Sequence, residues 1–285
     1  MKITGLIEKK QTLSFEVYPP KDTIPLDAVA ETLSRLYRFH PDFISCTYGA
    51  GGALKRKNME LCKLVKNGGQ ELISHYTCIG SSRESVRETV REYIDLGVEN
   101  LLALRGDFPE GWEGTQGDFA HADELLAFIG AEFPGLCLGA AAYPEKHLTA
   151  ASPEEDIRHL LSKQDSGAHF IMTQLCYDTN AFEKFLEKIR NAGIRIPVIA
   201  GVMPVLSREP TIRMTLSNGC SIPADLAGLM GLYSKNPSDF TKAGINYTAE
   251  LIARFRKLDI AGIHLYTMNK WEALSGILTV AGYSE

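Results

Sequence analysis

The sequence predicts a parallel (β/α)8 barrel, or TIM barrel, with extra helices before the eighth strand. The first indication is an alternation of short apolar stretches with longer segments of helical periodicity. The second is that the short stretches are apolar on both faces, as strands of a buried parallel sheet are. The third is the length of 285 residues, which suits a single barrel. We therefore expect residues 1–285 to form one domain.

The predicted strands are eight stretches that can each lie buried between a barrel interior and a layer of helices. In chain order they are TLSFEVY (12–18), DFISCTY (42–48), ELISHYTC (71–78), VENLLALRG (98–106), LCLGAAAY (136–143), AHFIMTQL (168–175), RIPVIAG (195–201) and IAGIHLYT (260–267). A doubly wound open sheet is the alternative fold. It is disfavoured because no GxGxxG motif follows the first predicted strand.

Helical segments separate the strands. Clear examples are LDAVAETLSRLYRF (26–39), SSRESVRETVREYIDLG (81–97), SPEEDIRHLLSKQDSG (152–167) and TNAFEKFLEKIRNAG (179–193). The last three begin with Ser or Thr, which are favoured N-caps, and end with Gly, which is favoured just after a helix. An insertion over residues 207–257 contains several further helical stretches and precedes the eighth strand.

Composition excludes several classes of function. The net charge is −5, with 45% apolar and 23% charged residues, and no basic cluster is dense enough for a nucleic acid or a membrane surface. The N-terminal segment lacks the apolar run of a signal peptide, and no stretch approaches the about 20 apolar residues that span a bilayer. The six cysteines are scattered without a CxxC pair, which argues against a zinc site or disulfides. We expect a reduced, cytoplasmic protein without a metal.

Polar residues end most of the predicted strands, where a barrel carries its active site. They are Glu16, Thr47, Tyr48, His75, Thr77, Arg105, Asp107, Tyr143, Glu145, His147, Gln174 and Tyr266. A ring of such residues predicts a functional barrel mouth. Each has an ordinary structural alternative: His75 as a satisfied core histidine, the tyrosines as rim residues, and Asp107 as part of a turn. The residues Asp156, His159 and Lys163 share one helix face, which could equally be a solvated surface.

Nine motifs in sequence order resemble one known family. They are SFEVYPP, CTYGAGG, HYTC, LALRGDFP, AAYPEKH, the helix from Asp156 to Lys163, MTQLCYD, GVMPV and HLYTMNK. Together they resemble the methylenetetrahydrofolate reductases, flavin-dependent enzymes that make 5-methyltetrahydrofolate, and the length resembles the bacterial-type catalytic domain. The resemblance implies a barrel that holds FAD at its mouth and reduces 5,10-methylenetetrahydrofolate.

The resemblance also implies roles for individual residues. Glu16 is the expected general acid, and Asp107 is expected beside flavin and folate. The positions that match flavin contacts are Thr47, Tyr48, His75, Arg105, Gly106, Asp107, Tyr143, His147, Ala150, Asp156, His159 and Lys163. The positions expected to contact folate or nicotinamide are Glu16, Asp107, Gln174, Tyr266 and Lys270.

Glu16 lies in an otherwise apolar strand. Desolvation there is expected to raise its pKa, so that it stays protonated near neutral pH and can protonate the departing folate amine. The alternative is a structural glutamate paired with Arg or His. Asp107 is expected to stay ionised near Arg105 and to favour the iminium cation that forms when the folate ring opens.

Two positions depart from the better-known NADH-using bacterial members. Arg208 lies near a position that carries an aromatic residue there, and Lys270 stands where they have arginine. The electron donor is therefore open between NAD(P)H and a partner protein. Two alternative functions remain: a flavin subunit that is inert toward NADH without its partner, and a flavin-free, pterin-binding methyltransferase barrel. A homo-oligomer or a complex with a partner subunit is expected from the family.

Overall fold

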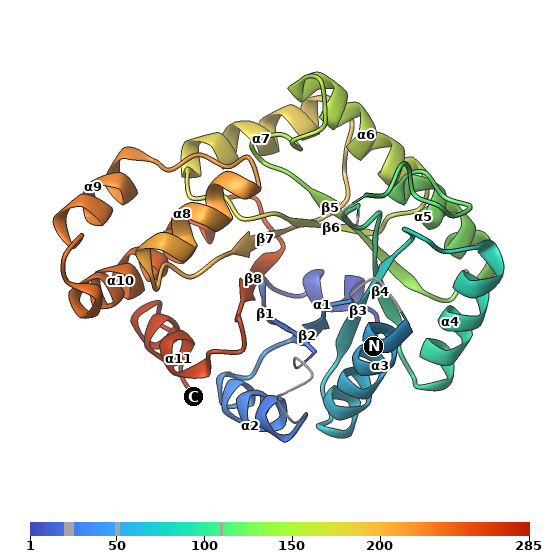
Figure 1. Ribbon diagram of the computed structural model, residues 1–285, viewed down its shortest axis with the longest axis horizontal. Helices are drawn as coiled ribbons and strands as arrows, with labels where there is room; N and C mark the ends of the chain where they lie inside the picture. The colour runs from blue at the N-terminus through green and yellow to red at the C-terminus, as the bar shows by residue number, and fades with distance from the viewer. Residues whose placement is uncertain (20–25, 49–51, 109–110) are drawn as a thin grey trace.

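The computed structural model describes residues 1–19, 26–48, 52–108 and 111–285. In these ranges, eight parallel strands form a closed barrel in which each strand pairs with the next and the last pairs with the first (Figure 1). They are β1 (Thr12–Val17), β2 (Phe43–Cys46), β3 (Leu72–Thr77), β4 (Asn100–Leu104), β5 (Cys137–Ala142), β6 (Phe170–Thr173), β7 (Val198–Val202) and β8 (Gly262–Tyr266). The predicted fold is confirmed, and every predicted strand is present.

Helices surround the barrel, except for α1, which lies at one of its ends (Figure 1). They are α1 (Thr4–Ile7), α2 (Leu26–Leu36), the 3-10 turn η1 (Tyr37–Phe39), α3 (Gly52–Asn67), α4 (Arg83–Asp95), α5 (Ala122–Glu132), α6 (Pro153–Asp165), α7 (Thr179–Asn191), α8 (Arg208–Ser217), α9 (Ala224–Leu232), α10 (Pro237–Phe255) and α11 (Trp271–Val280). The predicted insertion before the eighth strand is confirmed as α8, α9 and α10. Across the described ranges, these helices include none with both the length and the apolarity that a membrane crossing requires.

Helix boundaries follow the predicted caps with one exception. The side chains of Ser82 and Ser152 accept hydrogen bonds from backbone N–H groups in the first turns of α4 and α6. The expected cap at Thr179 is wrong, because Asp178 caps α7 and accepts from the N–H groups of Asn180 and Ala181. A carboxylate bonds two free N–H groups there and also favours the positive end of the helix dipole.

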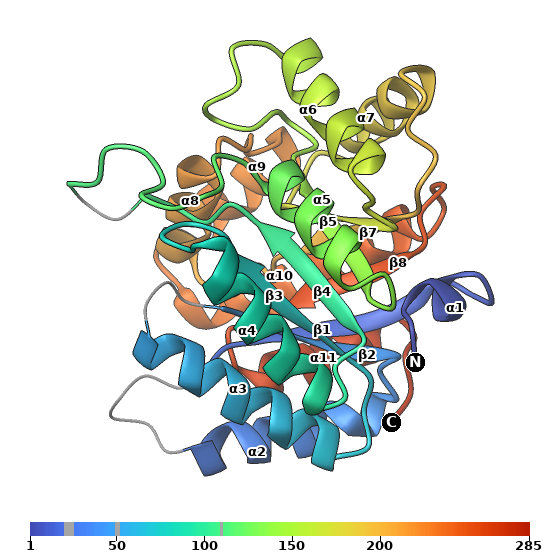
Figure 2. The ribbon, with the colours of Figure 1, turned by 90° about the vertical axis from the view of Figure 1, so that its right-hand side faces the viewer.

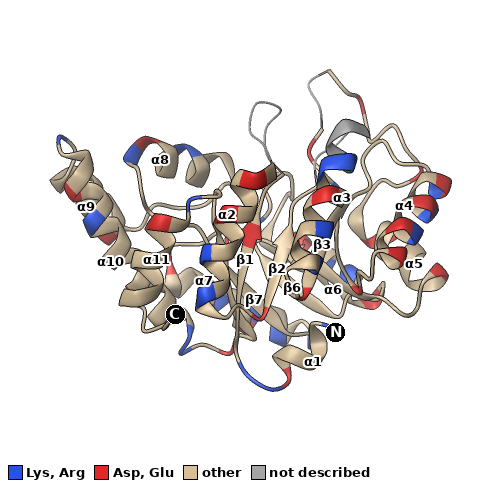
Figure 3. Cartoon of the chain, turned by 90° about the horizontal axis from the view of Figure 1, so that it is seen from below, with Lys and Arg blue, Asp and Glu red and all other residues tan. Residues whose placement is uncertain are grey.

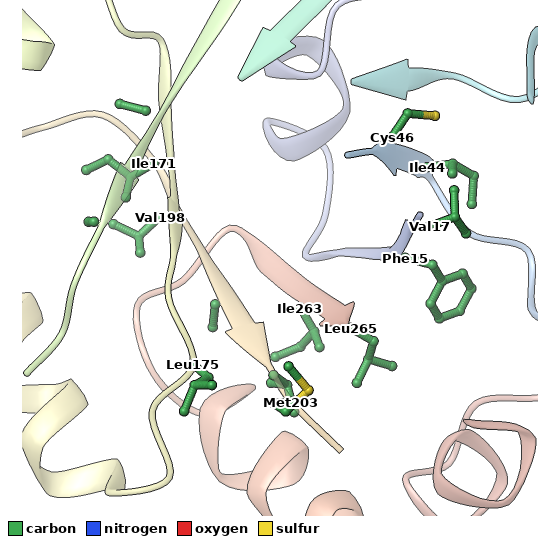
Figure 4. Close-up of a cluster of buried hydrophobic side chains, with 14 of the residues drawn as sticks. Phe15, Val17, Ile44, Cys46, Ile171, Leu175, Val198, Met203, Ile263 and Leu265 are labelled. Atoms are coloured by element: carbon green, nitrogen blue, oxygen red, sulfur yellow. The ribbon is translucent and has the colours of Figure 1, made fainter. Parts of the chain in front are cut away.

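Most of the apolar core lies between the barrel and its helices. Phe15 and Val17 belong to this layer, as do Ile263 and Leu265 (Figure 4). Because side chains alternate along a strand, the residues between them point into the barrel. On β1 and β8 these inward residues are polar.

The two ends of the barrel differ. The loop between β4 and α5 projects from one end, and α1 lies at the other (Figure 2). At the α1 end, Ile3 packs against a separate apolar cluster that includes Phe43 and Phe170. Gly139 makes room for it, since a Cβ there would lie 2.3 Å from the Phe170 ring. Charges of both signs are interspersed over the outer helices (Figure 3).

Candidate active site

Glu16 lies near the C-terminal end of β1 and points into the barrel. It pairs in register with Ser45 on β2 and with Tyr266 on β8. The residue is only 5% exposed. A carboxylate this deeply buried requires polar partners, because an unpaired charge there would be very costly.

Two histidines provide those partners. The Nε2 atom of His75 lies 3.7 Å from Oε2 of Glu16, and Nε2 of His264 lies 3.8 Å from the same oxygen. Each ring is held by a serine: Ser45 Oγ is 2.5 Å from His75 Nε2, and Ser14 Oγ is 2.8 Å from His264 Nδ1. Sequence reasoning missed His264 because it considered only residues at strand ends. The alternation of IAGIHLYT would have placed His264 on the inward face together with Tyr266.

The expected rise in the pKa of Glu16 is wrong. Burial does raise it, but the net pKa lies below the ordinary value, because the imidazoles of His264 and His75 and the hydroxyl of Tyr18 nearby favour the carboxylate. Burial lowers the pKa of His75 to about 4 against the opposing effect of Glu16. The structure thus supports the alternative, a glutamate paired with histidine, as the local arrangement. A role as an acid then needs a source for its proton.

The β4 strand delivers Arg105, Gly106 and Asp107 to the mouth. The guanidinium of Arg105 lies 4.8 Å from the ring centre of Phe108, and its Nε donates to the carbonyl of Gly106 at 3.2 Å. Gly106 has a φ of +91°, and a Cβ there would lie 2.7 Å from a methyl group of Ile79. Only glycine therefore fits this close turn. Asp107 is exposed beyond it.

The loop after β5 and the helix α6 form a second group. The carboxylate of Asp156 accepts a hydrogen bond from the backbone N–H of His147 at 2.9 Å. The rings of Tyr143 and His147 meet edge to face with their centres 4.4 Å apart. Lys163 Nζ donates to the carbonyl of Ala141 at 2.9 Å. The predicted positions thus converge on one region.

A cavity of about 200 Å³ lies in this region, lined by Tyr143, Asp156 and Lys163 among others. Burial raises the pKa of Tyr143 to about 12, with Asp107 contributing in the same direction and Arg105 opposing it. The β4 and β5 groups are therefore electrostatically coupled. Not every predicted position joins them: His159 lies on the exposed face of α6, and Ala150 is buried and contributes backbone atoms.

The remaining predicted positions lie around the barrel end. The amide of Gln174 donates to Asn218 Oδ1 at 2.8 Å, and the hydroxyl of Tyr266 donates to the carbonyl of Thr173 at 2.7 Å. Lys270 is exposed just before α11. The ring of Tyr48 lies 5.1 Å from that of Tyr76, and the carbonyl of Thr47 accepts from Asn58 Nδ2 at 2.8 Å. Of the motif residues, Pro20, Gly49–Gly51 and Pro109 lie outside the described ranges.

Glu145 has a structural role that the sequence did not reveal. Both of its carboxylate oxygens accept from the backbone N–H of Ser221 at 3.1 Å, and the Ser221 hydroxyl also donates to it. The thiol of Cys176 lies 3.6 Å from the same carboxylate. Glu145 therefore fastens the loop after β5 to the segment after α8.

The donors at the mouth suit an anionic cofactor with an aromatic part. An ammonium has three donors and a guanidinium has five, and among the described residues Lys163 and Arg105 each donate to a single carbonyl. The hydroxyl of Thr77, at the end of β3, is buried and has no hydrogen-bond partner among the described residues. A diphosphate could accept such bonds, and the rings of Tyr48 and Tyr143 offer surfaces for stacking.

A closed barrel with a buried acid and a cationic cavity at its strand ends has the organisation of a TIM-barrel enzyme. The family model "Methylenetetrahydrofolate reductase" matches residues 2–282. The chain therefore belongs to the methylenetetrahydrofolate reductase family.

Individual relatives agree with this assignment. "Methylenetetrahydrofolate reductase (NADH) 1" of Arabidopsis thaliana is 32% identical over 296 residues, which cover 99% of this chain and 50% of the relative. The "5,10-methylenetetrahydrofolate reductase" of Escherichia coli (strain K12) is 27% identical over 277 residues, which cover 97% of this chain and 92% of the relative. The chain spans about half the length of the plant and fission-yeast relatives.

Solved structures support the fold. An uncharacterized protein from Clostridium thermocellum, described as binding two copies of 5-methyl-5,6,7,8-tetrahydrofolic acid, has a TM-score of 0.68 at 15% identity and covers 98% of this chain and 97% of its own. Dihydropteroate synthase from Xanthomonas albilineans, in complex with 7,8-dihydropteroate, has a TM-score of 0.52 at 14% identity, covering 96% of this chain and 94% of its own. At these identities the likeness establishes the barrel fold alone.

Proposed function

We propose that this protein reduces 5,10-methylenetetrahydrofolate to 5-methyltetrahydrofolate with a bound FAD, using electrons from NAD(P)H or a partner protein. The observation that carries the proposal is the family match over residues 2–282. It is combined with the buried acid Glu16 and with two cations, Arg105 and Lys163, that each donate to a single carbonyl at the same end of the barrel. Bound FAD would supply hydride transfer, which no amino-acid side chain provides.

The FAD-binding residues are proposed from the β4, β5 and α6 groups. Arg105 and Lys163 would hold the diphosphate, and the half-buried position of Lys163 would strengthen that contact. Tyr48, Tyr143 and His147 would flank the flat ring systems. The side chain of Asp156 already fixes the loop that carries His147, so this part of the site is organised before a ligand arrives.

The substrate residues are proposed at the inner edge of the same mouth. Gln174 would contact the pterin or the nicotinamide, with Asn218 holding its amide in place. Lys270 would attract the glutamate tail of folate as a point charge, without the fork of an arginine. Tyr266 would shape the wall next to Glu16, with which it pairs across β1 and β8.

Glu16 is proposed to transfer a proton to the folate nitrogen that departs when the one-carbon bridge opens. Asp107 would stabilise the positive charge that develops on the iminium. Glu16 is enclosed by two histidines while Asp107 is exposed. The two carboxylates therefore differ in environment, which suits separate roles in acid catalysis and charge stabilisation.

An anaerobic visible spectrum of the purified protein tests the proposal. We expect a yellow protein that bleaches with NADH or NADPH and regains its colour when methylenetetrahydrofolate is added. A yellow protein that bleaches only with dithionite, yet is reoxidised by methylenetetrahydrofolate, would keep the folate reaction and assign the electrons to a partner protein. A colourless protein that binds folate and cannot be reconstituted with FAD would overturn the proposal in favour of a pterin-binding methyltransferase barrel.

A further inference from the structure

His264 presents an open ring nitrogen to Glu16. Its Nε2 is buried, has no hydrogen-bond partner within the described ranges, and faces Glu16 Oε2 at 3.8 Å. His75 lies at a similar distance, but its Nε2 is already bonded to Ser45 Oγ at 2.5 Å. Of the two histidines, His264 is therefore the one whose free nitrogen is available to the carboxylate.

The tautomer of His264 follows from its serine partner. Ser14 Oγ lies 3.2 Å from the carbonyl of Ile263, which can only accept, and 2.8 Å from His264 Nδ1. A hydroxyl has one proton. If that proton goes to the carbonyl, the serine oxygen must accept from Nδ1–H.

A neutral His264 ring in this tautomer carries a bare lone pair on Nε2. A lone pair that faces a carboxylate oxygen in a dry interior is unfavourable for both atoms. One added proton between them converts this contact into a charge-assisted pair. The contact between Glu16 and His264 is therefore favourable only when the two residues share one additional proton.

We propose that His264 is a positioning residue that holds a proton on Nε2 for Glu16 and returns it to Oε2 when folate binds. This inference rests on the proposed function and supplies the acid that it needs. In the first step the Nε2–H bond breaks and the Oε2–H bond forms, for which the two atoms must close to about 3 Å. In the second, the Oε2–H bond breaks, an N–H bond forms on the folate amine, and that nitrogen keeps the electron pair of the broken C–N bond. A solvent proton restores the pair after product release.

The surroundings favour this pair over other proton carriers. The groups that face Glu16 are His75 on β3, Cys46 on β2, Tyr18 just after β1, and His264 and Tyr266 on β8. Burial raises the pKa of both tyrosines and of the thiol, so these remain neutral. Burial also keeps His75 neutral above about pH 4.

The His264 ring is also held in one orientation. It stacks on Phe43 with ring centres 6.2 Å apart and meets Tyr266 edge to face at 5.6 Å. Nε2 therefore cannot turn away from Glu16 without disturbing two aromatic neighbours. A fixed donor of this kind is what proton transfer requires.

The pH profile of the folate half-reaction tests the inference with His264→Asn. Asparagine retains a polar atom near Nδ1 for Ser14 but has nothing at the Nε2 position. We expect the alkaline limb, where the acid is lost, to move to lower pH by about one unit, which makes the variant about tenfold slower at high pH. An unmoved limb, or one moved to higher pH, would overturn the inference, since a histidine that merely lowers the pKa of Glu16 would give the upward shift.

Nitrogen NMR of 15N-histidine-labelled protein, without folate, supplies a second test that does not require an active variant. We expect His264 to carry protons on both nitrogens while Glu16 faces it, and to lose the Nε2 proton in Glu16→Gln. A wild-type His264 ring that is neutral with its only proton on Nε2 would overturn the inference. Failure of the wild type to reduce folate with any donor would instead overturn the proposed function, and the NMR result would still report the proton position.

Discussion

The interior of this barrel has two layers of opposite character. At the α1 end, Ile3, Phe43 and Phe170 belong to a closed apolar cluster. Nearer the C-terminal ends of the strands, Glu16 lies beside two inward-facing histidines, each of which has a serine partner. The layers share the same strands and meet where Phe43 stacks on His264. The comparison teaches that the apolar layer stabilises the arrangement of the strands. The polar layer lowers stability, because it buries groups that can transfer protons.

The largest expected effect comes from the apolar layer. Phe170→Ala removes a fully buried ring that fills the space left by Gly139, so we expect the free energy of unfolding to fall by about 3–5 kcal/mol. Urea unfolding followed by tryptophan fluorescence measures it. Leu216→Ala, at a side chain 61% exposed, is the control and should change stability by less than about 0.5 kcal/mol. A small decrease in the free energy of unfolding of Phe170→Ala would show that the apolar layer is not what stabilises the barrel.

The polar layer should make stability depend on pH. The pKa of His75 falls from 6.5 to about 4 in the folded protein. Between these two pH values, His75 is therefore protonated in the unfolded chain and neutral in the folded protein. Stability from this group is present above about pH 6.5 and is lost as the pH falls toward about 4, by roughly 3 kcal/mol in all. Urea unfolding of His75→Gln between pH 7 and 5 should give a flatter dependence than the wild type. If the free energies of unfolding of the two proteins changed equally with pH, His75 would not be the origin of the dependence.

Glu16→Gln tests whether the polar layer supplies the proton for folate reduction. The amide fits the same space but cannot donate the proton, so we expect folate reduction to slow by about 100-fold or more. Flavin binding and flavin reduction by the electron donor should persist. Stopped-flow spectra of the two half-reactions separate these effects, and Glu272→Gln on the exposed start of α11 is the matched control. Normal folate turnover in Glu16→Gln would remove the assignment of this residue as the acid.

The contrast between the layers also explains what could be predicted from sequence. The strands and most helix caps follow from local periodicity and capping preferences, as at Ser82 and Ser152. The ring of polar strand ends predicted a site at the barrel mouth, and this stays a prediction. The pKa of Glu16 could not be predicted in this way, because its neighbours along the chain are apolar while its neighbours in space are His75 and His264. Those contacts come from strands far apart in sequence and exist only once the barrel closes.

Asp107→Asn should give the smallest of these effects. Asp107 is exposed at the mouth, so solvent and salt screen its field more than they screen a buried group. We expect the folate half-reaction to slow by about tenfold at low ionic strength, with the fold and flavin content unchanged. Added salt should narrow the difference between Asp107→Asn and the wild type, whereas the deficit of Glu16→Gln should persist, since a missing proton cannot be screened. Equal rates for Asp107→Asn and the wild type at low salt would remove the electrostatic role and leave the acid at Glu16 as the sole contribution of the two carboxylates.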